Sequence, residues 1–254
     1  MDIHNDQLLD KLGELQRELS NAQMQNSLFP NYLAGLSHDI RTPLNAIVGF
    51  SGLLTEPDLD PEQLKFYSYM ITRSSRKLLS MISNLIDLAK METGNLRIFN
   101  EKVNVSELLD EIREEMEEER RLYGKDQIEM TFQTPHNGSG NIQTDKTRLY
   151  QVLKIFLDNS LKFTKSGKIQ VISRIEDGQR VSFSIRDTGR GMDKPTLESL
   201  FELFPQGPNV EGLKIKSRGL GMLVAQKLAS LMKGEILINS EPKTGTTVSL
   251  TLPV

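Results

Sequence analysis

A histidine lies beside an acid and five residues before a proline in the segment LSHDIRTPLNAIVGF, residues 36–50. A carboxylate next to an imidazole, as in His38 and Asp39, can hold the proton of one ring nitrogen and leave the other nitrogen nucleophilic. Thr42 lies one helical turn beyond His38, over the same patch of surface. Pro43 offers no N–H to the carbonyl of Asp39 and crowds it, so we expect the helix to bend or loosen there. This pattern makes His38 a candidate nucleophile on a deformable helix.

The histidine segment alone could equally be a functional site or a chance arrangement of residues. Three later motifs favour a nucleotide pocket. LDNSLKFTKSG places Asn159 on a helix, and an amide oxygen suits a Mg²⁺ ion that takes its other ligands from water and phosphate. RDTGRGM ends a strand at Asp187, whose carboxylate can accept a hydrogen bond from an adenine amino group. SRGLGM opens a helix with Gly219 and Gly221, which let backbone N–H groups reach phosphates. Each motif is weak alone, but together they describe a nucleotide site that is not a P-loop.

The histidine segment belongs to a long heptad pattern. Apolar residues at alternating spacings of four and three run through residues 8–54, broken by Asn26. This pattern predicts one long helix that packs on a partner helix, and a helix buried within its own domain is the alternative. After a proline-containing turn at 55–63, a second apolar seam over 64–88 completes a helical hairpin. Because two hairpins form a four-helix bundle, we expect this module to be a homodimer.

Beyond about residue 104 the periodicity becomes mixed, which predicts an α+β domain. We expect helices over residues 105–123, 145–163 and 219–232. The strand-like segments are 128–133, 141–144, 168–176, 180–186, 235–240 and 246–252.

Composition narrows the function classes. A net charge of −3 over 254 residues argues against a dedicated nucleic-acid binder. The absence of cysteine excludes disulfides, thiolate metal sites and a cysteine nucleophile. No run approaches the ~18 apolar residues of a membrane helix. We therefore expect a cytoplasmic protein, with any membrane link made by an upstream sensor region.

Five motifs in one order make the chain resemble the sensor histidine kinases of two-component signalling, over about residues 29–254. LSHDIRTPLNAIVGF resembles the H box, RLYQVLKIFLDNSLKFT the N box, DTGRGM the G1 box, LFELFPQ the F box and SRGLGM the G2 box. The resemblance implies an all-α hairpin that forms a dimeric four-helix bundle, followed by an α+β sandwich of the Bergerat ATP-binding fold. The domains implied are an N-terminal coiled-coil linker helix (1–27), a dimerisation and histidine phosphotransfer domain (28–93), a linker (94–103) and a catalytic ATP-binding domain (104–254).

The resemblance also implies an activity and residue roles. His38 would accept phosphate from ATP, with Asp39 as the orienting base, and would pass it to an aspartate of a response regulator receiver domain. Thr42 would position water for dephosphorylation of the regulator, and Asn159 would bind Mg²⁺. The F-box aromatics would support a nucleotide lid over residues 205–217. The ATP-binding set implied is Asn159, Lys162, Asp187, Gly189, Gly191, Gly219, Leu220, Gly221 and Thr246.

Two positions depart from the family pattern. Ile155 stands where the N box usually has a second asparagine, and Ser217 stands where the G2 box usually has an earlier glycine. These departures leave open an alternative function, a pseudokinase-like scaffold or phosphatase with weakened ATP binding. A third class, an unrelated Bergerat-fold ATPase of the chaperone or repair type, is disfavoured by the H box.

Overall fold

The structure, a computed structural model, describes residues 39–134, 140–176, 179–201 and 220–253. The described residues fall into two compact units, one within 39–81 and the other within 82–253. The coiled-coil helix predicted for 1–27, His38, Gly219 and the predicted lid lie outside the described residues. No helix in the described part of the chain is long and apolar enough to span a membrane.

The first unit is the predicted helical hairpin. A helix over residues 39–53 is followed by a turn and by α2 (Pro61–Glu92), which begins in this unit. Asp60 and Gln63 cap α2 reciprocally, because the Gln63 N–H donates to Asp60 Oδ1 (2.7 Å) and the Asp60 N–H donates to Gln63 Oε1 (3.2 Å). Phe50 packs on Phe66 and Tyr67 at ring-centroid distances of 5.9 and 5.7 Å, which closes the hairpin near its turn.

Large apolar side chains remain exposed on this hairpin. Val48 is 65% exposed and Leu79 is 63% exposed. The other exposed large apolar side chains of the hairpin are Leu44, Leu64 and Phe66. A single hairpin therefore leaves much of its apolar surface uncovered, which is typical of an interaction surface.

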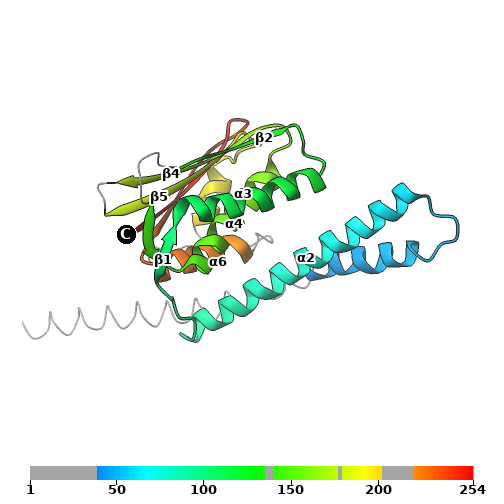
Figure 1. The fold of residues 1–254 in the computed structure, drawn as a ribbon, viewed down its shortest axis with the longest axis horizontal. Helices are drawn as coiled ribbons and strands as arrows, with labels where there is room; N and C mark the ends of the chain where they lie inside the picture. The colour runs from blue at the N-terminus through cyan, green and yellow to red at the C-terminus, as the bar shows by residue number, and fades with distance from the viewer. Residues whose placement is uncertain (1–38, 135–139, 177–178, 202–219, 254) are drawn as a thin grey trace, which may run out of the picture. The chain divides into compact units, whose positions relative to one another are not determined.

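The second unit is an α/β domain built on a mixed sheet. Its strands are β1 (Glu101–Asn104), β2 (Ile128–Gln133), β3 (Asn141–Thr144), β4 (Gly167–Glu176), β5 (Arg180–Asp187), β6 (Glu235–Glu241) and β7 (Gly245–Pro253). Its helices are α3 (Val105–Leu122), α4 (Lys146–Phe163), α5 (Lys194–Phe201) and α6 (Leu220–Leu231). The main sheet has the order β2-β4-β5-β7-β6, and β1 pairs with β3 in a separate ribbon. Figure 1 shows α3, α4 and α6 on one face of the main sheet.

The core lies between these helices and the sheet. Along β5, buried residues alternate with more exposed ones, so that Val181, Phe183 and Ile185 point into the core. α4 packs on β5, and α3 and α6 pack on α4; their buried faces include Phe156, Ile112 and Val224. Asp187 continues the inward series at the end of β5, so a carboxylate occupies a core-facing position. The packing thus fixes the end of this strand against α4.

The last turns of α2 belong to the second unit. Asp87 is 8% exposed, and its Oδ2 accepts from Arg148 Nη1 (3.0 Å) and Gln151 Nε2 (2.8 Å). Lys227 Nζ lies 2.6 Å from Glu92 Oε1. The end of α2 is therefore bound to both α4 and α6 by charge-assisted contacts.

The predicted fold class is confirmed, with a helical region followed by an α/β domain. β2 and β3 have the predicted bounds, and α4 begins immediately after its predicted cap, Asp145. β1 was not predicted, since it is only four residues long and is defined by its distant partner β3. α5 was also not predicted.

Candidate functional site

The centre of the candidate site is the carboxylate of Asp187. Its Oδ1 accepts from the Gly189 N–H (2.8 Å) and the Thr246 N–H (3.3 Å), and its Oδ2 accepts from Ser160 Oγ (3.2 Å). The structure therefore brings together predicted residues from the turn after β5 and the start of β7. Ser160 was not predicted, although its position next to Asn159 on α4 was a signal that could have found it.

Burial raises the pKa of the Asp187 carboxyl above its ordinary value. The hydrogen bonds from Gly189, Ser160 and Thr246 oppose this rise because they favour the ionised form. The carboxylate is held in one orientation by three donors while it remains able to accept a further hydrogen bond, since each carboxylate oxygen has two lone pairs. It is suited to accepting from a ligand N–H.

The turn after Asp187 requires glycine at two positions. A Cβ on Gly189 would lie 2.8 Å from the carbonyl oxygen of Phe163. Gly191 has φ 62°, and a Cβ there would lie 1.8 Å from the carbonyl oxygen of Glu241. The turn is therefore pressed between the end of α4 and the β6–β7 turn, which leaves no room for side chains at these two positions.

α4 carries the predicted metal ligand and a predicted phosphate contact. Asn159 is half-buried, and among the described residues its amide has no hydrogen-bond partner. Lys162 is exposed in the last turn, with Nζ 4.9 Å from the centre of the Phe163 ring. No group of three or more His, Asp or Glu side chains that could hold a metal ion occurs among the described residues. The amide oxygen of Asn159 fits a Mg²⁺ ion that takes its remaining ligands from phosphate and water.

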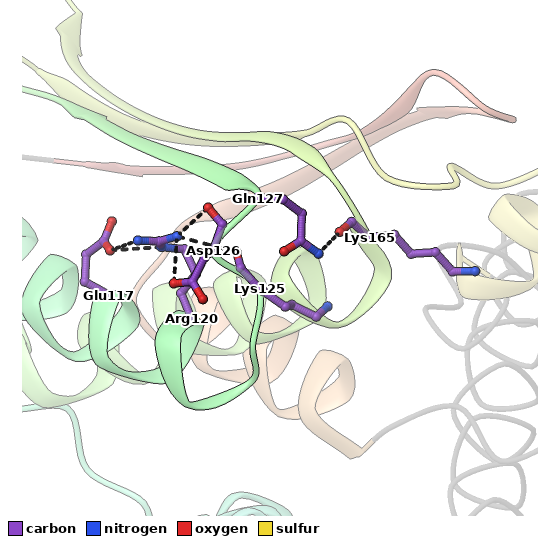
Figure 2. Close-up of polar contacts among 6 residues, drawn as sticks. All are labelled: Glu117, Arg120, Lys125, Asp126, Gln127 and Lys165. Carbon is purple, nitrogen blue, oxygen red and sulfur yellow. Dashed lines mark hydrogen bonds and ion pairs between the residues drawn. The ribbon is translucent and has the colours of Figure 1, made fainter.

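The turn between α3 and β2 fixes the C-terminal end of α4. Lys125 Nζ donates to the carbonyl oxygens of Thr164 (2.8 Å) and Leu161, and Gln127 Nε2 donates to the carbonyl oxygen of Lys165 (2.8 Å). Figure 2 shows this turn, in which Arg120 binds the carbonyl oxygen of Asp126 (3.0 Å). A lysine at the end of a helix satisfies carbonyls that have no partner within the helix. These contacts position the segment that follows Asn159.

Ile155 packs at the beginning of α6. The Cγ2 atom of Ile155 lies 3.3 Å from the place where a Cβ on Gly221 would be. Leu220, which precedes Gly221 in the chain, is buried. Ile155 takes no part in the hydrogen bonds around Asp187. The departure from the N-box pattern therefore replaces a polar side chain by an apolar contact between α4 and α6.

The described part of the histidine segment begins at Asp39. Asp39 is half-buried, Thr42 is exposed and Pro43 is buried, and the helix continues through Pro43 to residue 53. His38 lies outside the described residues, as do Gly219, the lid and Phe204, the second aromatic residue of the F box. The structure thus describes two of the three predicted residues of this segment and all of the predicted ATP-binding set except Gly219.

Two family models match the chain, one in each predicted half. Residues 31–94 match the His Kinase A (phospho-acceptor) domain, and residues 144–254 match the histidine kinase-, DNA gyrase B- and HSP90-like ATPase. The second match contains the whole set of residues around Asp187. The site is therefore that of an ATP-binding domain.

Curated relatives match most of this chain over part of their own, longer chains. The chain is 32% identical over 247 residues to the sensor protein GacS of Pseudomonas syringae pv. syringae, a match that covers 94% of this chain and 27% of GacS. It is 32% identical to the aerobic respiration control sensor protein ArcB of Escherichia coli, covering 87% of this chain and 28% of ArcB. The chain thus spans about a quarter of the length of these relatives.

Solved structures share the fold. The Acinetobacter baumannii histidine kinase AdeS matches 85% of this chain and 97% of its own at 19% identity, with a TM-score of 0.61. Full-length ShkA in complex with AMPPNP matches 88% of this chain and 46% of its own at 28% identity, with a TM-score of 0.60. Both family models, in this order, and the curated relatives agree with the five sequence motifs. The chain belongs to the sensor histidine kinases of two-component signalling.

Proposed function

We propose that this chain is the catalytic core of a sensor histidine kinase that phosphorylates its own His38 from Mg-ATP and transfers the phosphoryl group to an aspartate of a response regulator. The observation that carries the proposal is the buried Asp187 carboxylate, oriented by Ser160, Gly189 and Thr246. An acceptor held in this way suits the amino group of adenine. The structure of histidine kinase ThkA in complex with response regulator protein TrrA, which shares this fold at a TM-score of 0.62, supports a regulator as the partner.

The two proposed transfers need few protein groups. One imidazole nitrogen of His38 attacks the γ-phosphorus, the bond to the β–γ bridging oxygen breaks, and ADP leaves with the electron pair of that bond. Asp39 orients the ring and accepts the imidazolium proton. An oxygen of the regulator aspartate then attacks phosphorus as the N–P bond breaks, the electron pair of that bond returns to the imidazole nitrogen, and the proton held by Asp39 returns to the ring. Asn159 would hold Mg²⁺, which neutralises charge on the phosphates.

We further propose that the protein acts as a homodimer. The exposed apolar side chains of the hairpin, such as Val48 and Leu79, would be covered in a four-helix bundle formed with a second copy. Covering them stabilises the assembly in proportion to the apolar area removed from water.

Incubation with γ-labelled ATP and Mg²⁺ tests the proposed function. We expect an acid-labile, base-stable phosphoprotein whose label passes to a receiver domain, and light scattering should give twice the mass of 28.7 kDa. ATP binding without any phosphoprotein would instead support the scaffold alternative. That alternative rests mainly on Ile155. It is not favoured, because Ile155 packs at Gly221 and the hydrogen bonds from Ser160 and Gly189 to Asp187 are present.

Nucleotide affinity and protein stability should respond to pH in opposite directions through Asp187. Because burial raises the pKa of this carboxyl in the folded protein, its contribution to stability is present at low pH and is lost as the pH rises through the raised pKa. Adenine binding requires the carboxylate, so ADP affinity should fall as the pH is lowered through the same range. Calorimetric titration with ADP and thermal unfolding, followed upward from about pH 4, the ordinary range of an aspartate, to neutral pH, would measure both trends.

The Asp187→Asn variant is the control for this titration. It should bind ADP about tenfold more weakly near neutral pH, and its affinity should lose the pH dependence that Asp187 confers. A variant with the same pH profile as the wild-type protein would assign the titration to another group.

Thr42→Ala should slow removal of phosphate from the regulator while leaving autophosphorylation substantial. The Thr42 side chain is exposed on the turn that follows Asp39, where it can hold a water against a docked phosphoaspartate. Loss of a positioned water should cost roughly tenfold or more in rate. Both rates should be measured on this variant and on Ser51→Ala, which removes an exposed hydroxyl farther along the same helix. Parallel loss of both activities would assign Thr42 to the structure around Pro43, and unchanged dephosphorylation would remove it from the mechanism.

A further inference from the structure

Two cationic side chains meet one aromatic ring at the end of α4. Phe163, the last residue of the helix, is 38% exposed. The guanidinium carbon of Arg190 lies 4.6 Å from the centre of its ring, and Lys162 Nζ lies 4.9 Å from the same point. Both distances are within the range of cation–π contacts. Lys162 was expected near phosphate, whereas Arg190 had no assigned role.

The backbone of Arg190 is fixed on both sides. Its N–H donates to the carbonyl oxygen of Phe163 (3.4 Å), and its own carbonyl oxygen accepts from the Lys243 N–H (2.8 Å). The glycines at 189 and 191 pack against neighbouring backbone, so the turn has little freedom. Arg190 therefore lies three residues after Asp187, on a turn held at the edge of the candidate nucleotide site.

The charge of Arg190 is not balanced within the described part of the chain. Arg113, Arg120 and Arg148 all form ion pairs with carboxylates at 2.8 to 3.0 Å. Among the described residues, the guanidinium of Arg190 contacts the Phe163 ring and makes no ion pair. Such a guanidinium can pair with a bound anion such as a phosphate.

We propose that Arg190 is a further nucleotide-binding residue, which contacts the polyphosphate through its guanidinium and is positioned by stacking on Phe163. This assignment rests on the proposed ATP site. A guanidinium is planar, always charged and able to donate two parallel hydrogen bonds to a phosphate. Adenine recognition is left to Asp187, so Arg190 contributes affinity in proportion to the phosphates that the ligand carries.

Calorimetric titration with adenosine, ADP and AMPPNP, with and without Mg²⁺, tests the assignment. Arg190→Ala should weaken AMPPNP binding about tenfold and adenosine binding less than about twofold. The loss should shrink as salt is added, because added ions screen an exposed charge. Arg190→Lys, which keeps the charge but loses the planar fork, should lose less affinity than Arg190→Ala.

Two further variants separate positioning from net charge. Arg186→Ala removes an exposed arginine from the opposite side of β5 and should leave all affinities within about twofold of the wild type. In a Phe163→Leu background, Arg190→Ala should lower AMPPNP affinity less than it does in the wild type. The aromatic ring that positions Arg190 is already absent from that background.

Three outcomes would overturn the assignment. An equal loss for adenosine and AMPPNP would mean that Arg190 acts on the base or only clamps the turn. An unchanged AMPPNP affinity in Arg190→Ala would remove it from the site. Wild-type protein that binds none of the three ligands would overturn the proposed function and, with it, this assignment.

Discussion

Replacing His38 with glutamine should abolish autophosphorylation while leaving the affinity for ATP unchanged. Glutamine is neutral and similar in length, but its amide is no nucleophile for phosphorus, so the chemical step has no acceptor. The groups around Asp187 that would bind ATP all lie within the ATPase match over residues 144–254, more than a hundred residues away in the chain. Labelling with γ-labelled ATP should therefore fall to background, while a titration with AMPPNP should give the wild-type affinity.

The chain supplies a matched control for this experiment. It has three histidines, and replacing the other two, His4 and His136, with glutamine in one variant should keep full labelling. Label that persists in His38→Gln would place the phosphoacceptor elsewhere. An equal loss of AMPPNP affinity would contradict the division of labour between the two halves of the chain.

Asn159→Ala should remove most of the Mg²⁺-dependent affinity for ATP and almost all phosphorylation. The amide of Asn159 is half-buried on α4 and has no hydrogen-bond partner among the described residues, so its loss should disturb the fold little. Mg²⁺ held by few protein groups depends strongly on each of them, and we expect at least about a tenfold loss. ATP titrations with Mg²⁺ and with EDTA measure the metal-dependent part directly.

Asn239→Ala is the control for the loss of one amide. Asn239 is exposed on β6, and its replacement should leave both titrations unchanged. If Asn159→Ala lowers the affinity equally with Mg²⁺ and with EDTA, the residue acts on the nucleotide or on the fold and holds no metal. An unaltered Mg²⁺ dependence would exclude Asn159 as the ligand.

Features that depend on nearby residues were predictable from the sequence. The alternation of apolar residues set the bounds of β2 and β3, and Asp145 marked the start of α4 because a capping side chain acts on the next few residues. Asp187 and its glycines could be recognised for the same reason, since a tight turn after a strand is a local constraint. The heptad pattern likewise predicted the hairpin, because each helix needs an apolar stripe.

Contacts between distant segments were not predictable in this way. The hydrogen bond from Ser160 to Asp187 joins residues that are 27 positions apart, and the bond from Arg148 to Asp87 joins residues 61 apart. The stacking of Arg190 on Phe163 also depends on how the turn after β5 meets α4. No local rule of propensity or capping specifies these pairs, because they follow from the packing of whole elements.

Exchange of hairpins between related kinases would be constrained by the end of α2. A hybrid protein joined at residue 94, where the phosphoacceptor match ends, would keep Arg148 and Gln151 but take the residue opposite them from the donor. Unless that residue is also acidic, Arg148, which is largely buried, would lose its carboxylate partner. Breaking a buried ion pair in this way can cost about 3–5 kcal/mol of stability. A junction before Ile82 keeps Asp87 and Glu92 with the residues they bind. Natural recombination can thus exchange the hairpin without repacking only up to about residue 81, whereas α2 itself continues to Glu92.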